Sequence, residues 1–90
     1  MTKPAAPTIL PTHAGASTVV AKGVVPHARV EVFVAPPHTE TYLPAGSVTA
    51  HSDSVNVPLN RPLAAGDQVQ AQQTVQGTPS DRGPTTVTQP

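Results

Sequence analysis

Hydrophobic and polar residues alternate along several short segments of the chain. The clearest of these is Arg29–Val34, where Val30, Val32 and Val34 occupy every second position. Successive side chains of a β-strand point to opposite faces, so this spacing predicts a strand whose three valines share one buried face. Phe33 lies on the other parity, and we expect its ring to point outward.

Six further segments have strand character, and turn residues separate them at intervals of about 8–12 residues, as in an antiparallel sandwich or barrel. They are residues 8–10, 18–25, 47–50, 55–59, 69–75 and 84–88. A corner at Pro62–Asp67 is predicted to carry one buried leucine, Leu63. The longest stretch without proline, Leu63–Thr78, still contains two glycines, so no amphipathic helix of ordinary length fits.

A chain of 90 residues is large enough for one domain with a thin core. We divide it into an extended, Pro- and Ala-rich segment at residues 1–7 and a sandwich domain at residues 8–88. Because seven strands alternate in direction, the first begins at one end of the sandwich and the last finishes at the other. We therefore expect opposed termini, with the N-terminal segment serving as a semi-rigid anchor.

The charge pattern excludes several classes of partner. Five basic and five acidic residues give a net charge of zero, and the basic ones are scattered singly. Binding to nucleic acid or to anionic lipid needs clustered Lys and Arg, so we expect neither partner. No apolar run matches a signal-peptide core or a membrane span, so we expect no membrane insertion and no signal peptide in this chain. The sequence has no cysteine and hence no disulfide.

Two runs of residues resemble the bacterial immunoglobulin-like domains. Residues 21–32, AKGVVPHARVEV, are similar to the pattern V-x-G-x-A-x-P-G-A-x-V-x-V, and residues 63–80 are similar to L-x-x-G-x-x-V-x-A-x-Q-x-x-x-G-x-x-S. The first run departs from the pattern at Ala21, at His27 where glycine is usual, and by one residue fewer between Gly23 and Pro26. The resemblance implies an all-β, immunoglobulin-like antiparallel sandwich of about seven strands, located outside the cell or on the surface of a cell or virion. It implies a fold and leaves the function open.

His51, Ser52 and Asp53 are the three residue types of a hydrolase triad, but they are consecutive. A triad needs a nucleophile, a base and an orienting group that converge from separate segments. We interpret the three residues as a turn, and we expect no catalytic residue and no enzyme.

Loop histidines and aspartates fall in two sets, one at each end of the predicted sandwich: His27, His51 and Asp81, and His13, His38 and Asp67. Either set could supply nitrogen and oxygen ligands to a zinc-like ion. Neither H-x₃-H nor H-E-x-x-H spacing occurs, and the aspartates form no calcium-loop motif, so we expect no metal and no cofactor.

Contact residues are better candidates than catalytic ones. An outward Phe33 beside Arg29 and Glu31 would form a contact site, and Pro4 and Pro7 would contact a neighbouring chain. The glutamines between the inward positions of 68–76 are expected to form a polar solvent face.

Two functions remain open at this stage. The first is a structural or interaction module displayed on a bacterial surface protein or a phage virion, with other protein chains of that assembly as its partners. The second is a carbohydrate-binding module for cell-surface sugars. The two aromatic rings, Phe33 and Tyr42, are few for a sugar-stacking platform, which favours the first.

Overall fold

The computed structural model describes residues 3–90, and every regular element in that range is a β-strand. The strands are β1 (Thr8–Ile9), β2 (Thr18–Lys22), β3 (Arg29–Ala35), β4 (Leu43–Thr49), β5 (Ser54–Pro58), β6 (Gln68–Val75), β7 (Thr78–Pro79) and β8 (Thr86–Val87). The predicted all-β antiparallel sandwich is confirmed. Eight strands replace the expected seven or so, because the polar turn before the last strand contains the two-residue β7.

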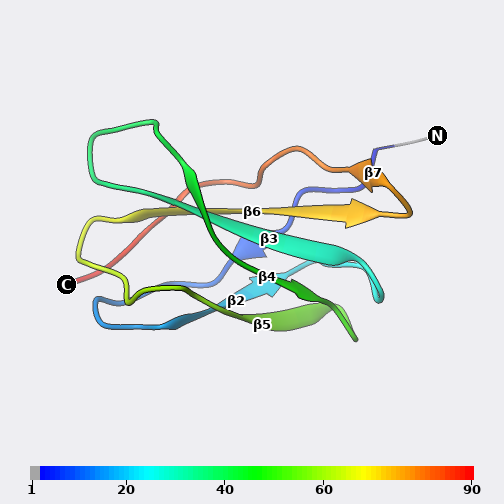
Figure 1. Cartoon of the computed structure of the whole chain (residues 1–90), viewed down its shortest axis with the longest axis horizontal. Helices are drawn as coiled ribbons and strands as arrows, with labels where there is room; N and C mark the ends of the chain where they lie inside the picture. Colours follow the sequence, from blue (N-terminus) through cyan, green and yellow to red (C-terminus); the bar gives the residue numbers. More distant parts are fainter. Residues whose placement is uncertain (1–2) are drawn as a thin grey trace.

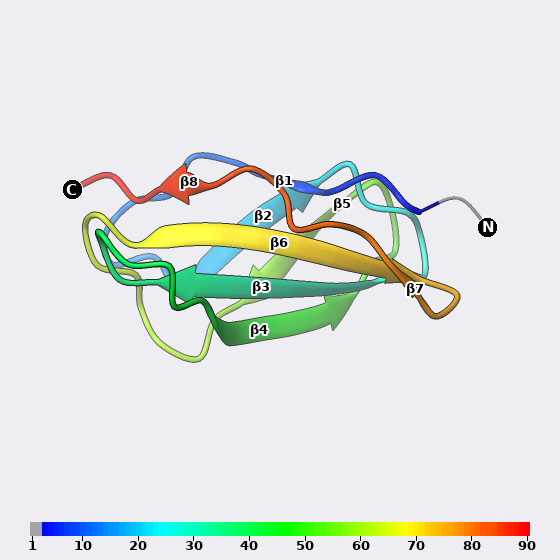
Figure 2. The same ribbon diagram turned by 90° about the horizontal axis from the view of Figure 1, so that it is seen from above.

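The strands form two antiparallel sheets that face each other (Figures 1 and 2). One sheet has the order β1-β2-β5, and the other has the order β4-β3-β6-β7, with β8 also paired to β6. Within residues 3–90, no helix is long and apolar enough to cross a membrane.

The core lies between the sheets and is built from small aliphatic side chains. Val30, Val32 and Val34 all face it, which confirms the predicted register of β3. Other buried members are Ile9, Val19, Ala21, Val24, Ala45, Ala50, Val57, Leu63, Val69 and Ala71. Val30, Val32, Val57 and Val69, on β3, β5 and β6, are completely buried. Burying each of these side chains stabilises the fold by roughly 1.5–3 kcal/mol.

Strand β4 begins four residues earlier than expected. Val32 pairs with Gly46 and Phe33 pairs with Pro44, so Ala45 is an extra residue that forms a bulge. Proline usually interrupts a sheet, but an edge strand can place it where no ladder hydrogen bond is lost. A side-chain carbon on Gly46 would collide with the backbone carbonyl oxygen of Pro58, so only glycine allows β4 and β5 to approach this closely.

Backbone contacts close both long sides of the sandwich. On one side, a parallel bridge joins His13 to Gln89. On the other, the Asn60 amide donates to the Ala45 carbonyl at 2.8 Å. The corner after Asn60 buries Leu63 as predicted, with 3% of its surface exposed.

The connection from β2 to β3 is a tight turn with an unusual residue in it. Val25 accepts a hydrogen bond from the Ala28 amide at 3.0 Å, Pro26 takes the second position and His27 the third, with φ at +72°. The His27 amide donates to Ala50, and the Ala50 amide donates to Ala28, which is the pattern of a glycine-type bulge. His27 thus adopts the left-handed backbone that glycine prefers in such turns.

The buried side chain of Gln73 ties three segments together. Its Oε1 accepts a hydrogen bond from the Val25 amide at 2.8 Å, and its Nε2 donates to the carbonyls of Ala5 at 2.7 Å and Gly23 at 3.1 Å. Gln73 is only 1% exposed, and the three hydrogen bonds satisfy its buried amide group. The side chain therefore connects the N-terminal segment and the β2–β3 connection to β6.

The chain enters the sandwich at one end and leaves it at the other (Figures 1 and 2). The molecule measures 38 × 23 × 18 Å, and both views (Figures 1 and 2) show the start and the end of the described chain apart along the long axis. The expectation of opposed termini is confirmed for the described residues.

Candidate contact surface

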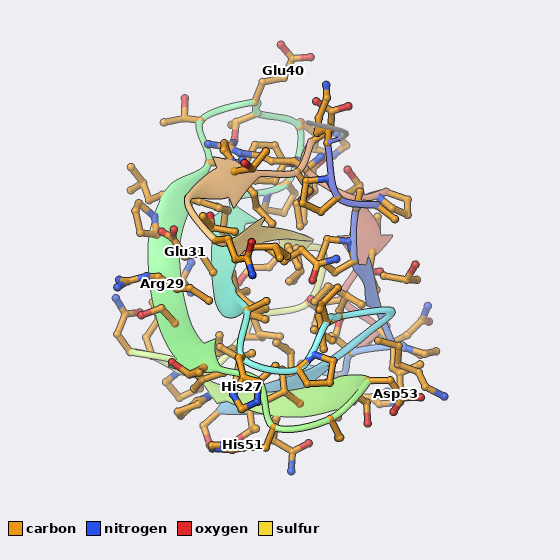
Figure 3. The ribbon with its side chains drawn as sticks, turned by 90° about the vertical axis from the view of Figure 1, so that its right-hand side faces the viewer. His27, Arg29, Glu31, Glu40, His51 and Asp53 are labelled. Carbon is orange, nitrogen blue, oxygen red and sulfur yellow. The ribbon has the colours of Figure 1, made fainter. Side chains whose placement is uncertain are left out.

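Arg29 and Glu31 lie together on the outer side of β3, where the strand's parity predicts them. Both side chains point away from the core, and Glu40 lies on a distant loop (Figure 3). Arg29 Nε is 3.9 Å from Glu31 Oε1, and the two side chains are 66% and 34% exposed. Such an exposed pair adds little stability, so both groups can exchange partners at low cost.

A shallow hollow adjoins this pair. It measures about 340 Å³ and is lined by Arg29, Glu31, Asn60 and the β4 residues Pro44, Ala45, Gly46 and Ser47. A second hollow of about 190 Å³ shares Pro44, Ala45 and Asn60, and it includes the exposed Leu43. The linings offer hydrogen bonds and apolar contact, and they contain no histidine that could act as a general base.

Phe33 departs from its expected exposure. Its ring lies on the outer face, outside the core cluster, yet only 7% of its surface is exposed. The guanidinium carbon of Arg82 lies 4.1 Å from the ring centroid. The prediction of an exposed Phe33 is therefore wrong, because a residue from the β7–β8 connection covers the ring.

The glutamines of β6 also differ from the predicted solvent face. Gln68 Nε2 donates to the carbonyls of Pro36 and Thr39, Gln70 Nε2 to Thr85 Oγ1, and Gln72 Nε2 to the Ser80 carbonyl. All three side chains are half-buried. They fasten the β3–β4 loop and the β7–β8 connection over the sheet, which explains how Arg82 reaches Phe33.

Pro7 is not available as a contact residue. Its side chain is fully buried, and a side-chain carbon on Gly83 would collide with its carbonyl oxygen. Gly83 in turn donates its amide to Ala71 on β6 at 2.8 Å. The expectation that Pro7 contacts a partner is corrected, because Pro7 packs inside this chain, whereas Pro4 stays half-exposed.

The loop histidines form no closed ligand set. His27 and His51 lie at the same end of the sandwich, as expected (Figure 3). Asp81 is paired with Lys3 at 3.0 Å, and the buried Asp67 accepts hydrogen bonds from Arg61 and from the Ala64 amide. Within residues 3–90, no three His, Cys, Asp or Glu side chains are grouped as metal ligands.

His51, Ser52 and Asp53 belong to the turn between β4 and β5. Ser52 Oγ donates to the Ser54 carbonyl at 3.0 Å, and the Asp53 carbonyl accepts from the amides of Gly23 and Val24. These contacts hold the backbone of the turn, and Ser52 Oγ does not donate to His51.

Comparison with known proteins gives one structural likeness. No protein-family model matches the chain, and no curated protein matches it. A solved structure described as "Biofilm associated protein - BSP domain" superimposes with a TM-score of 0.81 and 24% sequence identity. The match covers 97% of this chain and 14% of that one, so this chain spans only a small part of that structure's length. At this identity the likeness shows the fold alone.

Proposed function

We propose that this domain is a non-catalytic structural module of a larger surface assembly, where it acts as a spacer and makes adhesive contacts. The observation that carries the proposal is the placement of the two termini at opposite ends of a 38 Å rod (Figures 1 and 2). Such a domain can be inserted in series and adds length, whereas a domain with adjacent termini forms a side branch.

The topology supports an immunoglobulin-like type within the β-sandwiches. A three-stranded sheet, β1-β2-β5, faces a sheet centred on β3 and β6, and the two sequence runs that resemble bacterial immunoglobulin-like domains supply β3 and β6. The repeated valines of the first run are buried in β3, and Gln73, at the glutamine position of the second run, is buried in β6.

The structural neighbour supports a place on a bacterial surface. That structure is a domain of a biofilm-associated protein, and the matched region is 14% of that chain. We infer an extracellular location for this domain, with other protein chains of the assembly as neighbours. A virion decoration, the other assembly considered from the sequence, would use the same rod geometry.

Sugar binding by aromatic stacking has little support from the side chains. Phe33 is covered by Arg82, and Tyr42 is half-buried. A stacking platform needs exposed ring faces, so the adhesive contacts proposed here depend on polar groups.

The spacer role is tested with tandem proteins of one, two and four copies joined in series. Small-angle X-ray scattering measures the maximum dimension of each. We expect an increase of about 38 Å per copy, the length of the long axis. An array that grows in thickness with no matching gain in length would contradict the proposal, and the single copy serves as the control for folding.

A further inference from the structure

The outer face of the β4-β3-β6 sheet carries an arginine that is held in place but has no acidic partner among residues 3–90. We call this the Arg82 site and define it by Phe33, Tyr42, Gln70, Arg82 and Thr85. Three of its residues come from the sheet and its adjoining loop, and two come from the β7–β8 connection. The contact with Phe33 explains where Arg82 lies, but it leaves the charge of the guanidinium without an ion pair among residues 3–90.

The ring of Phe33 holds Arg82 from below. The guanidinium carbon is 4.1 Å from the Phe33 centroid and 5.8 Å from the Tyr42 centroid, so one face of the group rests on an aromatic surface. Phe33 is itself 7% exposed and fixed in β3. An arginine restrained in this way loses less side-chain entropy when it binds a ligand.

Three acidic side chains pair with basic groups other than Arg82: Asp81 with Lys3 at 3.0 Å, Glu31 with Arg29 at 3.9 Å and Asp67 with Arg61 at 3.3 Å. These are the ion pairs among residues 3–90, and neither Arg82 nor Glu40, on the β3–β4 loop, takes part in one. Stacking uses the face of the guanidinium and leaves its N–H edge to bind an anion, for which a carboxylate is the matching bidentate acceptor.

The rim of the site consists of groups that both donate and accept hydrogen bonds. Tyr42 Oη lies 3.3 Å from Thr85 Oγ1, and Gln70 Nε2 donates to the same Thr85 oxygen at 2.8 Å. Because Gln70 uses the oxygen of Thr85 as an acceptor, the Thr85 hydroxyl hydrogen can be donated to a ligand or to Tyr42. Hydroxyl and amide groups of this kind match the hydroxyls of a sugar.

We propose that the Arg82 site binds the carboxylate of an acidic sugar, a uronic acid residue of a surface polysaccharide, with Tyr42, Gln70 and Thr85 contacting the ring hydroxyls. The proposal rests on the adhesive part of the proposed function and names its ligand class. It does not depend on the spacer role. The net charge of the chain is zero, so attraction is local and binding should weaken as salt is added.

The test uses the whole chain and trigalacturonate as the probe. Two-dimensional NMR of backbone and side-chain N–H groups should show saturable shifts at Arg82, Gln70, Tyr42 and Thr85. The methyl ester of the same trisaccharide keeps every ring hydroxyl and removes the charge, and we expect its affinity to fall by tenfold or more, which corresponds to about 1.4 kcal/mol. Equal binding of acid and ester, or shifts located elsewhere, would overturn the proposal.

Two variants and one competing ligand complete the design. Arg82→Lys keeps a positive charge over Phe33 but loses the planar fork, and we expect it to bind the acid at least about tenfold more weakly. Lys22→Gln removes an exposed positive charge from β2, in the other sheet, and should leave the affinity unchanged. If Lys22→Gln weakens binding as much as Arg82→Lys, the site is wrongly placed. Tri-glutamate is the peptide control, and binding as tight as that of trigalacturonate would show that the ligand is an acidic peptide.

The melting temperature of each variant is measured in parallel, so that loss of binding is not confused with loss of folding. If Arg82→Lys is unstable, Thr85→Val provides the second variant. It keeps the shape of the side chain and should weaken sugar binding through the lost hydroxyl contact, and unchanged affinity in that variant would overturn the role of the rim. Scattering from the tandem proteins tests the spacer role separately.

Discussion

The guanidinium of Arg82 stacks on the ring of Phe33 across the outer face of the sheet, at 4.1 Å from the ring centroid. The two residues belong to different parts of the chain, and each changes the environment of the other. Phe33 becomes almost fully buried, and the side chain of Arg82 is restrained although its residue is exposed. The β7–β8 connection is therefore attached to the sheet by a cation–π contact as well as by the glutamines.

This contact should contribute measurably to stability. We expect Arg82→Ala to lower the free energy of unfolding by about 1 kcal/mol, from the lost cation–π interaction and the uncovered apolar surface of Phe33. Urea denaturation followed by circular dichroism measures the change. Arg29→Ala is the matched control, because its ion pair is exposed, and it should change stability by less than about 0.5 kcal/mol. Equal effects in the two variants would show that the stacking is unimportant.

The inward register of β3 makes a second prediction. Val32 is completely buried, so Val32→Asp places an unpaired charge in the thin core. We expect the free energy of unfolding to fall by about 4 kcal/mol or more. This approaches the total stability of a small domain, so the variant should be unfolded. Val32→Ala, which removes volume without adding charge, should remain folded at low temperature. A folded Val32→Asp protein with a native spectrum would contradict the register.

The features that could be predicted from the sequence are those that depend on neighbouring residues. The valines of β3 and the buried Leu63 follow from spacing within a few residues, and the structure confirms both. Phe33 illustrates the limit, because parity correctly placed its ring on the outer face but could not show that Arg82 covers it. Arg82 itself lies in a polar turn, where nothing in the neighbouring residues indicates an aromatic partner.

The same limit explains the other corrections. Pro7 looks like part of a free Pro-rich segment, and its burial depends on Gly83, which is distant in sequence. The glutamines of β6 alternate as a solvent face would, but their amides reach carbonyls and a hydroxyl in two separate loops. Long polar side chains can serve either purpose, and only the path of the covering loops decides between them.

The turn at His27 gives a prediction of increased stability. Its φ of +72° costs a residue with a Cβ about 1 kcal/mol, and glycine avoids that cost. We expect His27→Gly to raise the free energy of unfolding by about 0.5 kcal/mol, because the more flexible unfolded chain offsets part of the relief. His27→Ala also removes the imidazole but keeps the Cβ, so it should give no gain. Thermal melting compares the three proteins, and a destabilised His27→Gly would show that the imidazole itself stabilises the turn.

The final prediction concerns where the folded domain begins. The initial division at residue 8 treats 1–7 as a separable segment, but Ala5 accepts a hydrogen bond from the buried Gln73 and Pro7 is fully buried. Replacing residues 1–4 by a single Met should change stability by less than about 0.5 kcal/mol, since the Lys3–Asp81 pair is exposed. Replacing residues 1–7 in the same way should lower the free energy of unfolding by about 2–3 kcal/mol, because it leaves one N–H donor of Gln73 unpaired and empties the space that Pro7 fills. Hydrogen exchange at the Val25 amide, which Gln73 also binds, should quicken only in the longer truncation.

If both truncations are equally mild, the domain begins at residue 8 and the N-terminal segment is free to act as an anchor. If only the longer one is harmful, residues 5–7 belong to the folded domain, and Pro4 is the residue of the predicted contact segment that remains available to a neighbour.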